Sequence, residues 1–99
     1  MVNSDIHITH EDYGNAGRYL ASVTGIEGQA ELTWRNGPDG RYLVTHTFTP
    51  PAMRGQGVAL KLVEAMVEIA RGEGRRIVPY CGYVAAQARN RPDWADVME

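Results

Sequence analysis

The sequence predicts a mixed α+β fold in which an antiparallel meander of three strands leads into a β-α-β crossover. Residues 18–49 contain three extended runs separated by turn-forming residues, and residues 58–71 repeat apolar side chains at helical spacing. A further extended run follows at 76–81. Because a strand, a helix and a strand in succession favour a right-handed parallel crossover, this last run is expected beside the strand that ends at Thr49.

The first run of the meander, Arg18–Val23, has the composition of a strand, and glycines follow it where a turn is needed. In the second run, Gln29–Arg35, apolar and polar residues alternate, which is typical of a half-buried strand. Its predicted apolar face consists of Ala30, Leu32 and Trp34. Residues 36–40 are rich in Gly, Pro, Asn and Asp and predict a turn. The third run, Arg41–Thr49, is rich in β-branched and aromatic residues, and two prolines end it.

The helix is predicted from about Val58 to Arg71, and glycines 72 and 74 are expected to end it. Its apolar stripe consists of Ala59, Leu62, Val63, Met66, Val67 and Ala70. In the extended run that follows, Pro79 indicates a place where the ladder is interrupted. A short helix is expected over 82–89, and Trp94 is expected to cap the core near the end of the chain.

Length and charge restrict the class of protein. The 99 residues favour one domain spanning 1–99 with a modest core, and 43% hydrophobic with 22% charged residues is ordinary for a globular chain. A formal net charge of -2 gives no general attraction to polyanions, so nucleic acid is not expected as a partner. No apolar run is long enough to cross a bilayer, and residues 1–5 show no leader pattern, so we expect a cytoplasmic protein without a membrane partner.

Cysteine and histidine usage predicts that the protein has no metal. The single cysteine, Cys81, excludes an internal disulfide and a multi-cysteine metal site. The three histidines, His7, His10 and His46, have no close ligand spacing, and the first two are expected to be solvated near the chain end.

The segment between the third strand and the helix, residues 50–59, predicts a phosphate-binding loop. Gly55 and Gly57 allow the backbone to approach a ligand, and the unpaired N–H groups of the first helical turn favour an anion. A dinucleotide fingerprint would need glycine where Leu60 stands, and a P-loop would need a Gly-Lys-Ser/Thr sequence where Leu60-Lys61-Leu62 follows. A different phosphorylated cofactor is therefore expected, although a glycine-rich turn without a ligand is the simpler interpretation of the same letters.

Three motifs together resemble those of the GCN5-related N-acetyltransferase superfamily. Arg54, Gly57 and Ala59 match the Arg/Gln-x-x-Gly-x-Gly/Ala pattern of its acyl-CoA diphosphate loop. His46-Thr47 precedes that loop, and the segment 79–84, with Pro79, Cys81 and Tyr83, follows it. The combination is similar to the small, single-domain branch of the superfamily. The resemblance implies a mostly antiparallel sheet that opens into a V between two parallel strands, with acyl-CoA entering the V.

The resemblance also implies which residues hold acetyl-CoA. Backbone groups of the strand end would bind the pantetheine arm, with Thr47, Phe48 and Thr49 as candidates. The diphosphate would be held by Arg54, Gly55, Gln56, Gly57, Val58 and Ala59. Lys61 either adds a charge contact or is solvated on the polar face of the helix.

Three side chains are candidates for the chemistry of acyl transfer. His46 is expected on one strand face with Tyr42, Val44 and Phe48, either as a general base or as a histidine held in the core. Tyr83 either protonates the CoA thiolate or only packs at the end of the sheet. Cys81 either accepts the acetyl group before passing it on or is a small buried apolar residue.

The resulting hypothesis is an acetyl-CoA-dependent N-acetyltransferase that transfers the acetyl group directly to an amine. The chain lacks the helical pair that larger members carry between their first two strands, so the acceptor groove is expected to be open and to suit a peptide or protein amine. Two alternatives remain: a noncatalytic acyl-CoA-binding or sensing module, and a small interaction domain in which the glycines shape a turn.

Overall fold

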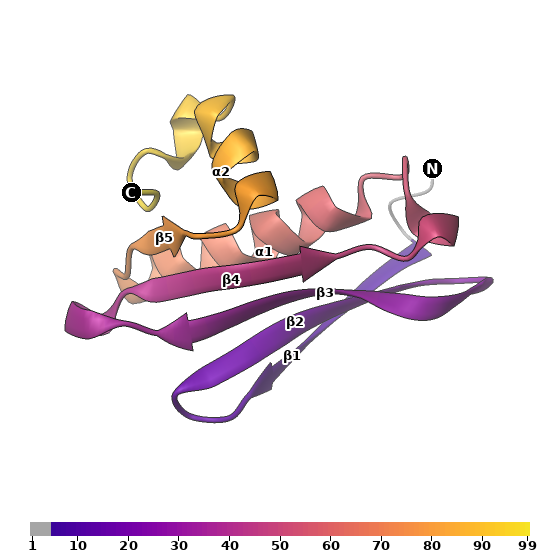
Figure 1. The fold of residues 1–99 in the computed structure, drawn as a ribbon, viewed down its shortest axis with the longest axis horizontal. Helices are drawn as coiled ribbons and strands as arrows, with labels where there is room; N and C mark the ends of the chain where they lie inside the picture. The colour runs from indigo at the N-terminus through magenta and orange to yellow at the C-terminus, as the bar shows by residue number, and fades with distance from the viewer. Residues whose placement is uncertain (1–4) are drawn as a thin grey trace.

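The computed structural model describes residues 5–99, so residues 1–4, on which the leader prediction partly rests, lie outside the described part. Five strands form one sheet in the order β1-β2-β3-β4-β5 (Figure 1). The strands are β1 (Ile6–Asp12), β2 (Ala16–Val23), β3 (Ile26–Asn36), β4 (Tyr42–Phe48) and β5 (Ile77–Pro79). The first four pair antiparallel, and β5 pairs parallel to β4. The predicted mixed fold, with a meander followed by a crossover, is confirmed.

Strand β1, which the sequence did not predict, pairs with β2 along its whole length at the edge of the sheet. Most of its side chains are exposed, His7 and His10 included. Its sequence alternates apolar and polar residues only at Ile6-His7-Ile8-Thr9 and continues with polar residues, which is too short a pattern to identify a half-buried strand. His10 stacks on the ring of Tyr19, with ring centroids 4.2 Å apart, so it contacts protein on one side while remaining exposed.

One face of the sheet, here called the inner face, carries the predicted residues Ala30, Leu32 and Trp34, and all three are buried. Helix α1 (Val58–Glu73) packs on this face, and its buried residues are Val58, Leu62, Val63, Met66, Val67 and Ala70. The predicted stripe is therefore correct except at its start, where Val58 is buried and Ala59 is only half-buried. On the opposite, outer face, Arg18 and Thr33 remain partly exposed.

The ladder between β4 and β5 is short. It runs from Tyr42 opposite Ile77 to Val44 opposite Pro79, and the amides of Tyr80 and Cys81 then donate to the carbonyl of Val44. Strand β4 continues to Phe48, whereas the chain after β5 turns into helix α2 (Gly82–Arg89). The two parallel strands therefore separate beyond Val44, which is the predicted V-shaped opening.

The C-terminal segment lies at the β5 end of the sheet, away from the turn that joins β1 and β2 (Figure 1). After α2, a short 3-10 turn (Pro92–Trp94) places Trp94 in the core, where it is 2% exposed, as predicted. Val97 and Glu99 then bond to the backbone of Ile77. This end of the chain thus belongs to the same core as α1 and the inner face.

A β-bulge in β4 corrects the face predicted for His46. Trp34 of β3 lies opposite Val44, but the preceding Thr33 lies opposite His46, so Thr45 is the extra residue. Because directly opposed residues point to the same side, the bulge reverses the alternation after Val44. Thr47 therefore shares the inner face with Val44, whereas His46 points outward. The prediction that placed His46 beside Tyr42 and Val44 assumed an unbroken strand and is wrong.

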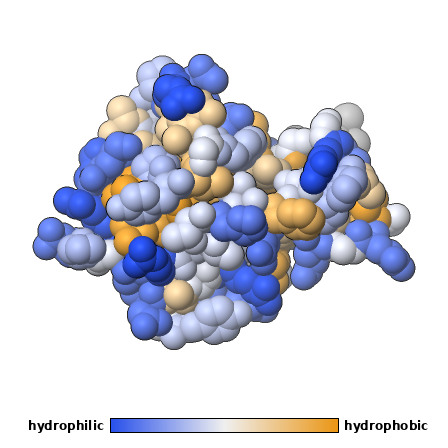
Figure 2. All heavy atoms as spheres, viewed as in Figure 1, coloured by the Kyte–Doolittle hydropathy of each residue, from blue (hydrophilic) through white to orange (hydrophobic). Residues whose placement is uncertain are grey.

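On the face shown in Figure 2, hydrophilic residues cover most of the surface and hydrophobic residues form small, separate patches. Across residues 5–99, no helix combines the length and apolar character needed to cross a membrane. The described residues also contain no group of three or more His, Cys, Asp or Glu side chains that could hold a metal.

Candidate active site

The loop between β4 and α1 is anchored by one buried side chain, and its residues 54–57 are exposed. A 3-10 turn (Pro51–Met53) follows the strand, and the Met53 side chain beneath it is fully buried. Gly55 and Gly57 then have φ values of 81° and 75°, in the left-handed region that other residues rarely adopt. Gly57 is the N-cap of α1, so the loop leads directly into the positive end of the helix.

The backbone amides in the second half of this loop and at the start of α1 have no partners within residues 5–99. The amides of Met53 and Arg54 donate to the two proline carbonyls, and that of Lys61 donates to Gly57. Between them, the N–H groups of residues 55–60 have no acceptor within residues 5–99. A Cβ placed on Gly55 or Gly57 would meet nothing within 4 Å. The loop is thus neither sealed by other side chains nor satisfied internally, as a site for an external anion requires.

A pocket of about 220 Å³ opens over the loop. Its walls are Thr49, Met53, Arg54, Gly55, Gly57, Val58, Ala59 and Tyr83. The guanidinium of Arg54 donates from Nε to the carbonyl of Thr49 at 3.0 Å, and the side-chain Nε2 of Gln56 donates to the carbonyl of Ala52 at 3.2 Å. The Arg54 contact fixes a cation beside the pocket. Of the predicted diphosphate residues, Gln56 is the one that does not line it.

Lys61 lies one turn after the loop, and its ammonium is 3.5 Å from the carboxylate of Glu64. It is therefore paired with a neighbour on the helix surface. Its side chain is 39% exposed. Pairs of this exposure are weak, so the contact leaves Lys61 free to exchange partners.

Cys81 and Thr47 meet inside the opening between β4 and β5. The Thr47 hydroxyl lies 3.3 Å from the Cys81 sulfur, and the cysteine is half-buried immediately before α2. Burial by itself raises the pKa of the Cys81 thiol, but the Thr47 hydroxyl acts in the opposite direction. The backbone amides of Val84 and Tyr83 at the start of α2 add to that effect. The pKa of the thiol is lowered overall, which favours the nucleophilic thiolate.

Tyr83 joins this opening to the pocket over the loop, because it follows Cys81 by two residues and lines the pocket. Burial raises the pKa of its phenol, and the charges of Cys81 and Glu64 raise it further. The phenol therefore remains protonated at neutral pH, as a proton donor requires.

The structure brings together only some of the predicted catalytic residues. Thr47, Cys81 and Tyr83 lie along the opening, whereas His46 is exposed on the outer face. Both interpretations of His46 assumed the inner face, so a histidine held in the core is excluded. Phe48 shares the outer face with His46 and is 46% exposed. The contact between Thr47 and Cys81 was not foreseen, because it depends on the bulge at Thr45, for which the sequence gives no signal.

A sheet that opens between two parallel strands, with a glycine loop starting the crossover helix, defines the acetyltransferase architecture. The model of the family described as GCN5-related N-acetyl-transferase matches residues 18–97, and the chain belongs to this family. The chain is also similar to the solution structure of a GCN5-like candidate N-acetyltransferase from Staphylococcus aureus, with a TM-score of 0.74 and 25% identity. That match covers 97% of this chain and 90% of the other. A comparison with curated proteins gave no match. The family and the structural neighbour support an acetyltransferase.

Proposed function

We propose that the protein is an acetyl-CoA-dependent N-acetyltransferase whose loop at residues 54–59 binds the diphosphate of the cofactor. The observation that carries the proposal is the set of unpaired amides at residues 55–60 beneath an open pocket. These amides and the positive end of α1 favour a phosphate, and Arg54 adds a full charge. The pantetheine arm would then follow Thr47, Phe48 and Thr49 along β4 into the opening.

Direct transfer uses these residues as follows. A neutral amine attacks the thioester carbonyl, the carbon–sulfur bond to CoA breaks, and Tyr83 gives its proton to the departing thiolate. His46 is the candidate to accept the proton lost by the amine, which requires the acceptor to reach the thioester from the outer face through the gap between β4 and β5. An open outer face suits an acceptor on a peptide or protein, and Phe48 offers it an exposed aromatic surface.

A covalent route is the second candidate, and the lowered pKa of Cys81 favours it. In that route the Cys81 thiolate displaces CoA, and the acetyl-cysteine then transfers its acetyl group to the amine. Mass spectrometry after mixing with acetyl-CoA alone separates the two routes. One added acetyl group, absent in Cys81→Ser, supports the covalent route, whereas turnover by Cys81→Ser supports direct transfer.

The diphosphate site is tested by calorimetry with CoA and acetyl-CoA on the wild type and on Ala59→Glu. Ala59 lines the pocket at the start of the helix, so the new carboxylate would occupy the anion site without disturbing the fold. We expect at least tenfold weaker binding, which is about 1.4 kcal/mol. Ile69→Glu is the matched control, because Ile69 is exposed on the same helix and does not line the pocket.

The same experiment distinguishes the alternatives. Binding by the wild type with no thiol release in the presence of a panel of amines would favour the noncatalytic acyl-CoA-binding module. No binding of CoA or acetyl-CoA by the wild type would contradict the proposal and favour the interaction domain.

A further inference from the structure

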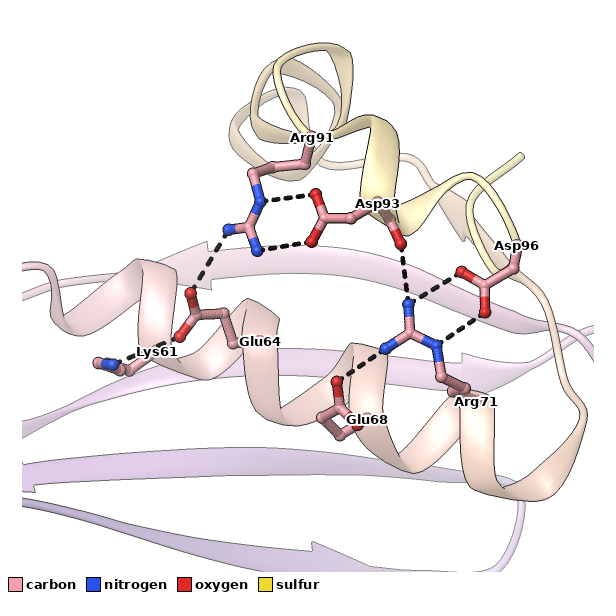
Figure 3. Close-up of polar contacts among 7 residues, drawn as sticks. All are labelled: Lys61, Glu64, Glu68, Arg71, Arg91, Asp93 and Asp96. Carbon is pink, nitrogen blue, oxygen red and sulfur yellow. Dashed lines mark hydrogen bonds and ion pairs between the residues drawn. The ribbon is translucent and has the colours of Figure 1, made fainter.

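Glu64 lies between Lys61 of the same helix and Arg91 of the C-terminal segment, in one of the two groups of charges that connect α1 to that segment (Figure 3). One of its carboxylate oxygens lies 3.5 Å from the Lys61 ammonium, and the other lies 3.4 Å from the guanidinium of Arg91. Lys61 is one turn from the phosphate loop, and Arg91 follows the end of α2. The Glu64 carboxylate thus joins α1 to a residue just beyond the end of α2.

Arg91 is oriented by its own segment, independently of Glu64. Its Nε and Nη2 lie 3.1 and 3.0 Å from the two carboxylate oxygens of Asp93, and its guanidinium stacks 4.3 Å from the centre of the Trp94 ring. Within residues 5–99, Glu64 is the α1 side chain that forms an ion pair with Arg91. A second connection between the segments, from Arg71 to Asp96, lies two turns further along α1.

We propose that Glu64 is a positioning residue that ties the end of α2 to α1 and thereby holds Tyr83 against the cofactor pocket. This inference rests on the function proposed above. Tyr83 is in the first turn of α2, and Arg91 is just beyond the last, so the ion pair holds the far end of the helix to α1 while buried Val84 packs its near end into the core. The carboxylate also acts on Tyr83 directly, because its negative charge disfavours the phenolate.

The test compares Glu64→Gln with Glu68→Gln. Glu68 lies one turn further along α1 and pairs with Arg71 of the same helix, so its loss removes an ion pair without cutting a tie between segments. Hydrogen exchange of the α2 amides is expected to become about two- to fivefold faster in Glu64→Gln, the change that loss of a partly exposed ion pair produces, and to stay unchanged in Glu68→Gln.

A second measurement separates a positioning role from a purely structural one. The pKa of Tyr83, followed by NMR titration and assigned with Tyr83→Phe, should fall in Glu64→Gln, because the carboxylate that raises it is gone. In Arg91→Gln the tie is cut but the carboxylate remains, so α2 exchange should accelerate without a lower pKa of Tyr83. Cys81 also raises this pKa and is unchanged in both variants.

The proposal requires both effects. Equal α2 exchange in the Glu64→Gln and Glu68→Gln variants, or an unaltered Tyr83 titration in Glu64→Gln, would overturn it. Both measurements use the protein without cofactor, so failure of CoA binding in the wild type would refute the proposed function separately from this inference.

Discussion

Two glycines in nearly the same backbone conformation allow the effect of backbone strain on stability to be separated from the effect of a substitution on cofactor binding. Gly57 has φ 75° and ψ 17° at the start of α1, and Gly74 has φ 69° and ψ 27° at its end. A Cβ at either position would meet nothing within 4 Å. Gly57→Ala and Gly74→Ala should therefore lose stability through the backbone alone. The left-handed conformation costs a residue with a Cβ about 1–2 kcal/mol.

For a domain of this length, such a cost lowers Tm by about 4–16 °C, and both variants should show it in thermal unfolding followed by circular dichroism. Their effects on cofactor binding should differ. Gly57 lines the pocket and an added Cβ would meet no protein atom, so in Gly57→Ala the methyl group would compete with the ligand, and we expect at least tenfold weaker binding of CoA, about 1.4 kcal/mol. Gly74→Ala should bind CoA with the affinity of the wild type.

Gly57→Asn provides the final comparison, because asparagine tolerates the left-handed region better than alanine. It should recover part of the lost stability while still binding CoA poorly. Wild-type stability of Gly57→Ala would contradict the strain assigned to this position. Equal CoA binding by Gly57→Ala and Gly74→Ala would contradict the role of Gly57 in the pocket.

Two further predictions concern the opening and the C-terminal segment. Thr47→Val removes the hydroxyl that lowers the pKa of Cys81, so this pKa should rise and alkylation of the thiol should require a higher pH. The control is Thr45→Val on the bulge, which should leave the pH dependence of alkylation unchanged. The pKa of Asp96 is lowered by its hydrogen bonds to Arg71, so this pair contributes stability above the ordinary carboxyl pKa that is lost as the pH falls through the folded value. Asp96→Asn should flatten that part of the acid unfolding curve, followed by tryptophan fluorescence; an unchanged curve would contradict the assignment.

The parts of the fold that the sequence predicted are those set by local physical rules. Leu32 and Trp34 alternate with polar residues because β3 is buried on one face, and that period is visible in the letters. The crossover helix begins at Val58 as predicted, after two prolines that end the strand and two glycines in the left-handed conformation. Both features depend on residues close together in the chain.

The features that were missed depend on partners far away in the chain. Strand β1 exposes most of its side chains and is defined by its backbone bonds to β2, so its composition carries little signal. The bulge at Thr45 is defined by the pairing with β3: Thr33 and Trp34 are consecutive, but their partners in β4 are separated by the extra residue. The Thr33 hydroxyl lies 2.8 Å from that of Thr45, a contact that no pattern within either strand predicts.

This bulge has a functional consequence in the proposed reaction. In an unbroken strand, Val44 and His46 would point to the same side, and Thr47 would point away from the opening that contains Cys81. With Thr45 inserted, Thr47 lies on the inner face and contacts the Cys81 sulfur, whereas the preceding residue, His46, lies on the outer face. In the proposed direct transfer, the amine nitrogen must still contact the thioester carbon, so an acceptor that arrives from the outer face would have to reach it through the gap between β4 and β5. A single extra residue thus places the contact with Cys81 and the candidate base on the two faces of one strand.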